Sequence, residues 1–238
     1  MKTLLDIKDK ICTDGFAVID SVFNDEEIKS LLLIISQADI SKPAFRKTND
    51  LFAIRQFLKE LPATVEILLN KKLKNIITRL FSDEYFAVKS IYFDKPPNSN
   101  WFVSYHQDLT ISVDKKINID GFSFWTLKQN QYSVQPPINI LEDNFTIRIH
   151  LDKTVSENGA LKVIPKSHLK GICRPATIDF KNEIEISCSV EKGGIMIMKP
   201  LLLHSSGKTI NNNKRRVVHI EFSRIQLPST LNWSEKII

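Results

Sequence analysis

The 238-residue chain has few of the features on which several common protein classes depend. It contains no run of 18 apolar residues, so no membrane-spanning helix is predicted. Its three cysteines, Cys12, Cys173 and Cys188, are an odd number without CxxC spacing. This pattern argues against a disulfide framework or a zinc knuckle and favours buried thiols. The first twelve residues interrupt every apolar run with Asp or Lys, unlike a secretory signal, and we expect a cytoplasmic protein.

Concentrated basic charge and glycine-rich linkers are also missing. The formal charge is +6, but the lysines and arginines are spread among 27 acidic residues. The densest basic stretch is "KRR" at 214–216, and dispersed charge of this kind does not predict nucleic-acid binding. Only seven glycines are present, no repeat or internal linker stands out, and the composition is 42% hydrophobic. We therefore expect one domain with one sizeable core, no nucleic-acid or membrane partner and a small-molecule substrate; the sequence does not indicate an oligomeric state.

Two kinds of hydrophobic pattern follow one another along the chain. "SVFNDEEIKSLLLIISQA" predicts a helix capped by Asn24, "GFAVID" before it a short strand, and "LPATVEILLNKKLKNIITRLF" a second helix. After Phe81, short apolar runs bounded by turn residues predict about eight strands. Strands without alternating helices favour a sandwich or barrel. We expect a helix-rich part at 1–82, a β core at 83–225 and a tail at 226–238, all in one domain.

Within the expected strand "WFVSYHQDLTISV", His106 and Asp108 are two positions apart. On a strand, residues i and i+2 project from the same face, so both side chains could bind one ion. An HxD triplet also occurs by chance, so its meaning depends on a third ligand. His204 is the best candidate, because it ends an apolar run and is followed by Ser205 and Ser206. Two histidines and one carboxylate on one face of an iron ion leave positions open for a co-substrate and O₂.

The remaining histidines are weaker candidates. His150 and His219 lie inside expected strands, where a hydrogen-bonded core histidine or a residue behind the ligands is the ordinary role. His168 lies in the turn-like "PKSHLKG", where a surface role is favoured.

Two arginines, Arg215 and Arg216, open the strand "RRVVHIEFS" eleven residues after His204. A guanidinium there could bind a terminal carboxylate in bidentate fashion. A ligand that chelates the metal at one end and presents a carboxylate at the other fits the pattern, and 2-oxoglutarate is such a ligand. Neighbouring strand residues point to opposite faces, so only one arginine can serve. Spacing favours Arg215, but Arg216 would serve if Val218 and Phe222 face the barrel interior.

Taken together, these segments resemble the phytanoyl-CoA dioxygenase family over essentially the full chain. The resemblance is carried by "GFAVIDSVFNDEEIKSLL", "YHQD", "SENGALKVIPKSHLKG", "HSSG" and "RRVVHIEFS". "FDKPPNSNWFVSYHQDLTI" and "VQPP" further resemble a bacterial subgroup. The family implies a mainly β fold with flanking α: a double-stranded β-helix, jelly-roll and cupin-like, with N-terminal helices packed on it. It also implies a dioxygenase that uses Fe(II), with 2-oxoglutarate and O₂ as co-substrates, and most often hydroxylates its substrate.

Carried onto this chain, the resemblance implies that His106, Asp108 and His204 hold the metal as the catalytic centre. Arg215, or else Arg216, would pair with the far carboxylate of 2-oxoglutarate, Ser206 would add a hydrogen bond, and Lys95 could line the same pocket. For the substrate, the candidates are Gln107, which should point to the opposite face of its strand, Trp101 and Trp125. An aspartate at 108, where halogenating relatives carry a small residue, favours oxygen transfer.

Two other functions fit the same residues. One is a sensor or degenerate member that binds metal and 2-oxoglutarate without turnover, and the other is a cupin-like metal enzyme that does not use 2-oxoglutarate. No motif names the substrate. Its contacts are expected from loops such as "DKKINIDGFSFWTLKQNQYSVQPP", where an aromatic cluster could cover a substrate or pack a lid.

Overall fold

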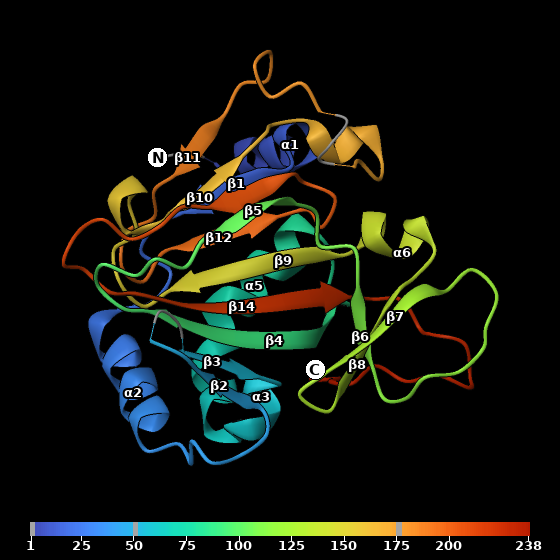
Figure 1. Ribbon diagram of the computed structural model, residues 1–238, viewed down its shortest axis with the longest axis horizontal. Coiled ribbons are helices and arrows are strands. Elements are labelled where there is room, and N and C mark those ends of the chain that lie inside the picture. Colours follow the sequence, from blue (N-terminus) through green and yellow to red (C-terminus); the bar gives the residue numbers. More distant parts are fainter. Residues whose placement is uncertain (1–2, 50–51, 175–177) are drawn as a thin grey trace.

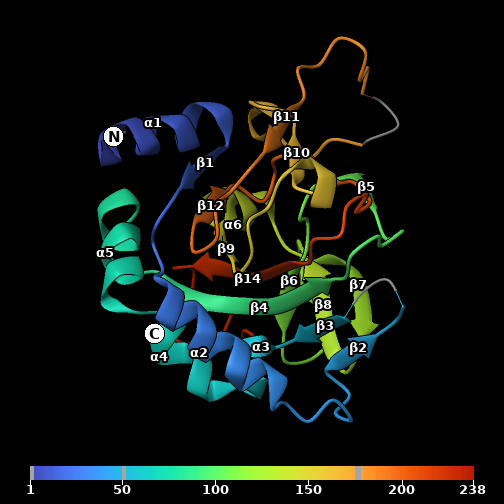
Figure 2. The ribbon, with the colours of Figure 1, turned by 90° about the vertical axis from the view of Figure 1, so that its left-hand side faces the viewer.

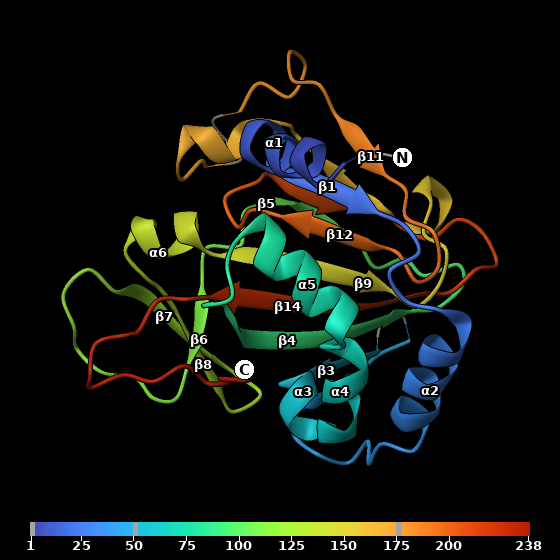
Figure 3. The ribbon, with the colours of Figure 1, turned by 180° about the vertical axis from the view of Figure 1, so that it is seen from behind.

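The structure is a computed structural model that describes residues 3–49, 52–174 and 178–238. Figure 1 shows the antiparallel sheets. The helices are α1 (Leu4–Asp14), α2 (Asp25–Ser36), α3 (Phe57–Glu60), α4 (Val65–Leu68), α5 (Lys71–Leu80) and α6 (Ile138–Asp143), with 3₁₀ turns η1 (Pro62–Thr64), η2 (Ser156–Asn158) and η3 (Ser167–Lys170). The view from behind in Figure 3 shows α1, α4 and α5 in front of the sheets. Across the described ranges, none of these helices is long and apolar enough to cross a bilayer.

The strands form three sheets, in which every pairing is antiparallel. The large sheet has the order β1 (Phe16–Ile19), β12 (Ile195–Met198), β9 (Phe145–His150), β14 (Arg215–Ser223), β4 (Phe86–Lys95), β3 (Phe52–Arg55), β2 (Phe45–Lys47). The second sheet has the order β11 (Ile186–Cys188), β10 (Leu161–Val163), β13 (His204–Ser206), β5 (Val103–His106). The third has the order β6 (Ile111–Val113), β8 (Gln131–Gln135), β7 (Ser123–Lys128). This is the expected mainly β, double-stranded β-helix fold.

The two faces of the large sheet differ in chemistry because side chains alternate along each strand. On β14, Val218, Ile220 and Phe222 belong to the core that also holds the buried residues of α1, α2 and α5. Figure 3 shows α5 lying across this face. The alternate residues, among them Arg215 and His219, are buried on the opposite face, toward the smaller sheets. The interior of the β-helix therefore receives charged side chains, while the helices cover an apolar surface.

The sequence signals for the N-terminal part were largely correct. Asn24 caps α2, and its Oδ1 accepts hydrogen bonds of 2.9 Å from the backbone N–H groups of Glu26 and Glu27. β1 forms where "GFAVID" predicted it. The second helical stretch is interrupted, however, because Asn70 begins α5 as a new N-cap and accepts from the N–H of Leu73.

Two predictions about strands were wrong. The strand expected over 101–113 breaks into β5 and β6, so Asp108 lies in the connection after β5. The segment expected as a loop contains the hairpin β7–β8, closed by Gln129 and Asn130 with φ values of 49° and 59°. A two-residue turn of this kind normally carries Gly, Asn or Asp, and Gln129 gave no such signal.

The C-terminal segment returns to the β core and buries a carboxyl group there. Ile237 pairs with Ala87, and Trp233 pairs with Val113. Between them Glu235, only 4% exposed, accepts a 2.9 Å hydrogen bond from the backbone N–H of Ser90 and another from the Ser90 hydroxyl. Burial raises the pKa of Glu235 to about 7 from the ordinary 4.5, more than these hydrogen bonds lower it.

This raised pKa gives a pH-dependent contribution to stability. The folded protein binds the Glu235 proton more tightly than the unfolded chain, so the stabilisation is complete below pH 4.5 and is lost as the pH rises through 7. We expect the free energy of unfolding of the wild type to fall by roughly 3 kcal/mol more than that of Glu235→Gln over this range. Urea unfolding at several pH values measures the free energy of unfolding of both proteins. The prediction would be contradicted if the two free energies changed with pH in parallel.

Candidate metal centre

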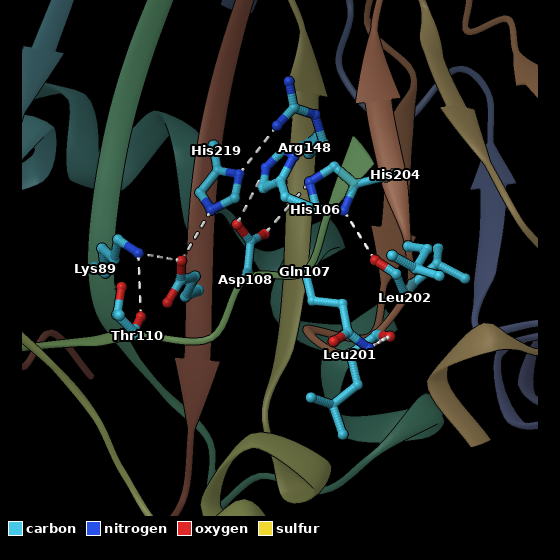
Figure 4. A network of polar contacts seen from close by, with 12 residues as sticks. Lys89, His106, Gln107, Asp108, Thr110, Arg148, Leu201, Leu202, His204 and His219 are labelled. Atoms are coloured by element: carbon cyan, nitrogen blue, oxygen red, sulfur yellow. Dashed lines mark hydrogen bonds and ion pairs between the residues drawn. The ribbon is translucent and has the colours of Figure 1, made fainter. Parts of the chain in front are cut away.

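Three predicted ligands meet at the junction of β5 and β13. His106 ends β5, His204 begins β13, and the two residues are paired in register. Asp108 follows β5, with its backbone N–H bonded to the carbonyl of Pro200. The His106 Nε2 lies 3.9 Å from Asp108 Oδ1, and the His204 Nε2 lies 3.8 Å from Oδ2 (Figure 4). One potential ligand atom from each residue lies within 4.8 Å of the others, so the three could hold one metal ion.

Backbone carbonyls orient both imidazole rings. The His106 Nδ1 lies 2.8 Å from the Ser104 carbonyl, and the His204 Nδ1 lies 2.9 Å from the Leu202 carbonyl. A carbonyl only accepts hydrogen bonds, so each Nδ1 carries the proton and each Nε2 keeps its lone pair. Both lone-pair nitrogens face Asp108, as a metal requires.

The charge states suit a divalent cation. Burial would raise the pKa of Asp108, but His204, His219 and Lys89 together hold that pKa well below its usual range. Burial lowers the pKa of His204 to about 4. At neutral pH the site therefore presents a carboxylate and a neutral imidazole, the ligand forms of these groups. The Asp108 Oδ2 is buried without a hydrogen-bond donor, which is consistent with a cation as its partner.

A second group, Asp108, His219 and Glu221, also has metal-ligand spacing, but its atoms are engaged elsewhere. Glu221 lies 2.6 Å from the Lys89 Nζ and accepts a hydrogen bond from the His219 Nε2. The His219 Nδ1 accepts in turn from Arg148. Lys89 and Arg148 already supply positive charge here, so we assign this group to positioning and not to metal binding.

A cavity of about 440 Å³ opens beside the three ligands, and Arg215 reaches into it. Arg215 is only 2% exposed, and its Nε and Nη1 have no hydrogen-bond partner in the described chain. Burial and the nearby Arg148 lower its pKa to about 9, so Arg215 is still charged at neutral pH. A buried guanidinium without a carboxylate is costly, which points to an anionic ligand at this position.

Arg216 points to the other side of the strand. Its Nε and Nη2 bind the two carboxylate oxygens of Asp152 at 2.8 and 2.6 Å. Which arginine enters the cavity depends on the face of β14 that carries Val218 and Phe222. Val218 and Phe222 both belong to the helix-covered core. Arg215 is therefore the arginine in the cavity.

The other predicted pocket residues have different positions. Ser206 lines the cavity, and its hydroxyl donates to the Gly159 carbonyl at 3.2 Å. Trp101 lines it as well, stacked on Phe93. Lys95 is buried beside Trp101 and donates to the Gly207 carbonyl, outside the cavity lining.

Trp125 lies outside the cavity as well. It packs against a separate hydrophobic cluster with Phe122 and Tyr132, which favours the packing role for these aromatic residues over contact with a substrate at this cavity.

Gln107 has its amide in backbone contacts and not in the cavity. Its Nε2 donates to the carbonyls of Gly171 and Leu201 at 2.8 and 2.6 Å, and its Oε1 accepts from the N–H of Cys173 at 2.8 Å. These three bonds join the loop after η3 to the loop before β13. The orientation away from the ligands was expected, but the structure gives Gln107 a positioning role where the sequence suggested substrate contact.

Removing the Gln107 amide should therefore lower stability. Gln107→Ala leaves one buried and two partly buried backbone groups without this partner, and we expect the free energy of unfolding to fall by roughly 2 kcal/mol. Chemical denaturation measures this loss. An unchanged denaturation midpoint together with weakened substrate binding would show that Gln107 contacts the substrate.

Several charged residues of the cavity were not predicted. They are Arg55 on β3, Lys89 on β4, Lys128 on β7 and Arg148 on β9. For Arg148 a signal existed, because "FTIRIHL" alternates polar residues with Phe145, Ile147 and Ile149. The other three come together only through the strand order, which no local pattern specifies.

Comparison with known proteins agrees with this architecture. The family model for phytanoyl-CoA dioxygenase (PhyH) matches residues 11–217. A Caenorhabditis elegans protein, "Phytanoyl-CoA dioxygenase domain-containing protein 1 homolog", is 23% identical over 97% of this chain and 95% of its own length. The non-heme alpha ketoglutarate dependent carbocyclase SnoK from nogalamycin biosynthesis superposes with a TM-score of 0.69 at 14% identity, covering 92% of this chain and 83% of SnoK. The structure of EvdMO1 superposes with a TM-score of 0.68 at 19% identity, and the match covers 92% of this chain and 50% of EvdMO1.

The chain shares its fold with the non-heme alpha ketoglutarate dependent carbocyclase SnoK, and its described residues include a cluster of two histidines and one carboxylate with metal-ligand spacing. The family model, which matches most of its length, places this chain in the phytanoyl-CoA dioxygenase family.

Proposed function

We propose that the protein is an Fe(II)- and 2-oxoglutarate-dependent dioxygenase that hydroxylates a small molecule and releases succinate and CO₂. The observation that carries this proposal is the buried, unpaired guanidinium of Arg215 in the same cavity as His106, Asp108 and His204. A dicarboxylate with a 2-oxo group can chelate a metal at one end and satisfy this guanidinium at the other.

Each group of this chain has a defined task in the proposal. His106 and His204 supply neutral Nε2 atoms and Asp108 supplies a carboxylate, and these would hold the iron. Arg215 would bind the far carboxylate of 2-oxoglutarate, and the Ser206 hydroxyl would add a hydrogen bond by turning its proton from the Gly159 carbonyl to that carboxylate. When bound, Fe(II) supplies the centre at which O₂ and 2-oxoglutarate react and the substrate is oxidised.

The residues behind the ligands hold them in place. Arg148 donates to His219, His219 donates to Glu221, and Lys89 pairs with Glu221. This chain of contacts holds His219 and Lys89 beside Asp108, and both are among the groups that lower the pKa of that carboxyl. Buried side chains such as Ile91 and Leu161 line the same cavity and exclude water from it.

Anaerobic reconstitution followed by addition of O₂ tests the proposal. We expect 2-oxoglutarate to bind only when Fe(II) is present, and succinate to form only when O₂ is then added with a substrate from a metabolite screen. Binding without succinate across a broad screen would indicate a sensor or inactive member. Metal binding without 2-oxoglutarate binding would overturn the proposal and favour a cupin-like enzyme.

A further inference from the structure

The cavity beside the candidate metal centre is lined by more cationic side chains than the binding of a metal and 2-oxoglutarate requires. Five cationic side chains line it, whereas Asp108 is its only acidic lining residue among those the structure describes. Lys89 is neutralised by Glu221, and the proposed far carboxylate of 2-oxoglutarate would neutralise Arg215. Asp108 and the other end of 2-oxoglutarate would balance a divalent metal. Within the described ranges, this leaves Arg148, Arg55 and Lys128 without a counterion.

Arg55, which is half-buried, and Lys128, which is exposed, both line this cavity. Arg55 ends β3, and its Nε donates at 2.9 Å to the side-chain carbonyl of Gln129, the residue after Lys128. Figure 2 shows the β7–β8 hairpin beside β3. Within the described ranges neither side chain forms an ion pair with a carboxylate, and burial together with Arg46 lowers the pKa of Arg55. Among the residues that the structure describes, no carboxylate compensates the charge of the Arg55 guanidinium.

The backbone next to Arg55 is strained, because Gln56, which follows it, has a φ of 50°. Left-handed backbone at residues other than glycine costs about 1 kcal/mol or more and tends to persist where function fixes the geometry. Arg55 and Lys128 come from two different sheets and line one cavity.

We propose that the substrate carries an anionic group, a carboxylate or a phosphate, and that Arg55 and Lys128 bind it at the mouth of the cavity. This assignment rests on the proposed function, because it takes Arg215 as occupied by 2-oxoglutarate. Arg55 supplies guanidinium donors and Lys128 a mobile ammonium, which together suit tetrahedral as well as planar anions. Deeper in the cavity, Arg148 adds positive potential that attracts an anionic substrate from solution. The uncharged part of the substrate would then lie toward Trp101 and the metal.

Titration of small probes into the protein loaded with Fe(II) and 2-oxoglutarate under anaerobic conditions tests this inference. The probes are butanoate, methyl phosphate and the neutral butanamide, with apparent Kd taken from tryptophan fluorescence and thermal shift. We expect at least one anion to bind tenfold or more tighter than butanamide. Arg55→Ala with Lys128→Ala should weaken that anion at least tenfold and leave the Kd of 2-oxoglutarate unchanged. Lys74→Ala, an exposed charge on α5, is the matched control and should change nothing.

The outcomes separate the two proposals. Selective binding of butanoate would identify the anionic group as a carboxylate, and selective binding of methyl phosphate would identify it as a phosphate. Either result supports the inference. Equal binding of all three probes, or anion binding that survives the double substitution, overturns it, since the anion would then be at the metal or elsewhere. Absence of 2-oxoglutarate binding in the loading step contradicts the proposed function instead. If the double variant does not fold, the single Arg55→Gln and Lys128→Gln variants, checked by circular dichroism, give the same comparison.

Discussion

Replacing Arg215 with alanine is expected to weaken the binding of 2-oxoglutarate by about 100-fold or more. The side chain is almost fully buried, and its unpaired nitrogens lie in the cavity beside the three candidate ligands. Truncating one partner of a buried, hydrogen-bonded charge pair costs about 3 kcal/mol or more, and each 1.4 kcal/mol is a factor of ten in affinity. Calorimetric titration of 2-oxoglutarate into anaerobic, Fe(II)-loaded protein measures the change.

The neighbouring arginine provides a matched control. Arg216→Ala removes the same guanidinium from the same strand, but it breaks the pair with Asp152 outside the cavity. We expect Arg216→Ala to lower stability without changing the Kd of 2-oxoglutarate by more than about twofold, because no contact with the cavity is lost. Equal effects of the two substitutions on affinity would rule out Arg215 as the specific partner. Arg215→Ala itself is expected not to destabilise the metal-loaded protein, since an unpaired buried charge disappears.

Replacing His106 with alanine is expected to remove specific metal binding. Loss of residues that only orient metal ligands typically costs 10- to 100-fold in affinity, so loss of a ligand should cost more than about 100-fold. Equilibrium dialysis with Fe(II) or Mn(II) measures the affinity directly, without dependence on turnover. The fold should survive, because the His106 side chain is 39% exposed at the end of a strand and contributes little to the core. We expect the metal-free variant to unfold within about 0.5 kcal/mol of the wild type.

His168→Ala is the matched control for this experiment. His168 hydrogen-bonds to the carbonyl of Cys12 on the helical side of the molecule and is not part of the cluster. Its loss should leave metal affinity unchanged. A variant His106→Ala that keeps its metal but loses stability would assign His106 a structural role and contradict the metal centre.

Local chemistry made the helix cap predictable from the sequence and singled out the candidate ligands. The capping box at Asn24 and the alternation in β14 are properties of a few adjacent residues. The prediction of a shared site for His106 and Asp108 rested on one continuous strand, whereas β5 ends at His106. Asp108 turns toward the histidines because its backbone N–H binds the Pro200 carbonyl, a contact between segments over 90 residues apart.

The rest of the site could not be predicted, because it depends on pairing between distant strands. Arg55 enters the cavity through the pairing of β3 with β4, and Lys128 through a hairpin whose turn lacks glycine. Arg148 was detectable in principle from its alternation, but the sequence did not indicate which side of β9 would be apolar core. The choice between Arg215 and Arg216 required the same knowledge, namely that the helices cover the face carrying Val218.

Because alternate residues of β14 face the helix-covered core and the cavity, this strand does not tolerate a change in its length. One residue inserted or deleted between Gly207 and Arg215 can be absorbed by the loop, since the loop contributes no alternating set of side chains. The same change within Arg215–Ser223 would exchange the faces of every later residue, placing His219 and Glu221 among the helices and Val218 and Ile220 in the cavity. Length variation in this protein should therefore be confined to the loop before β14, while the strand itself keeps its length.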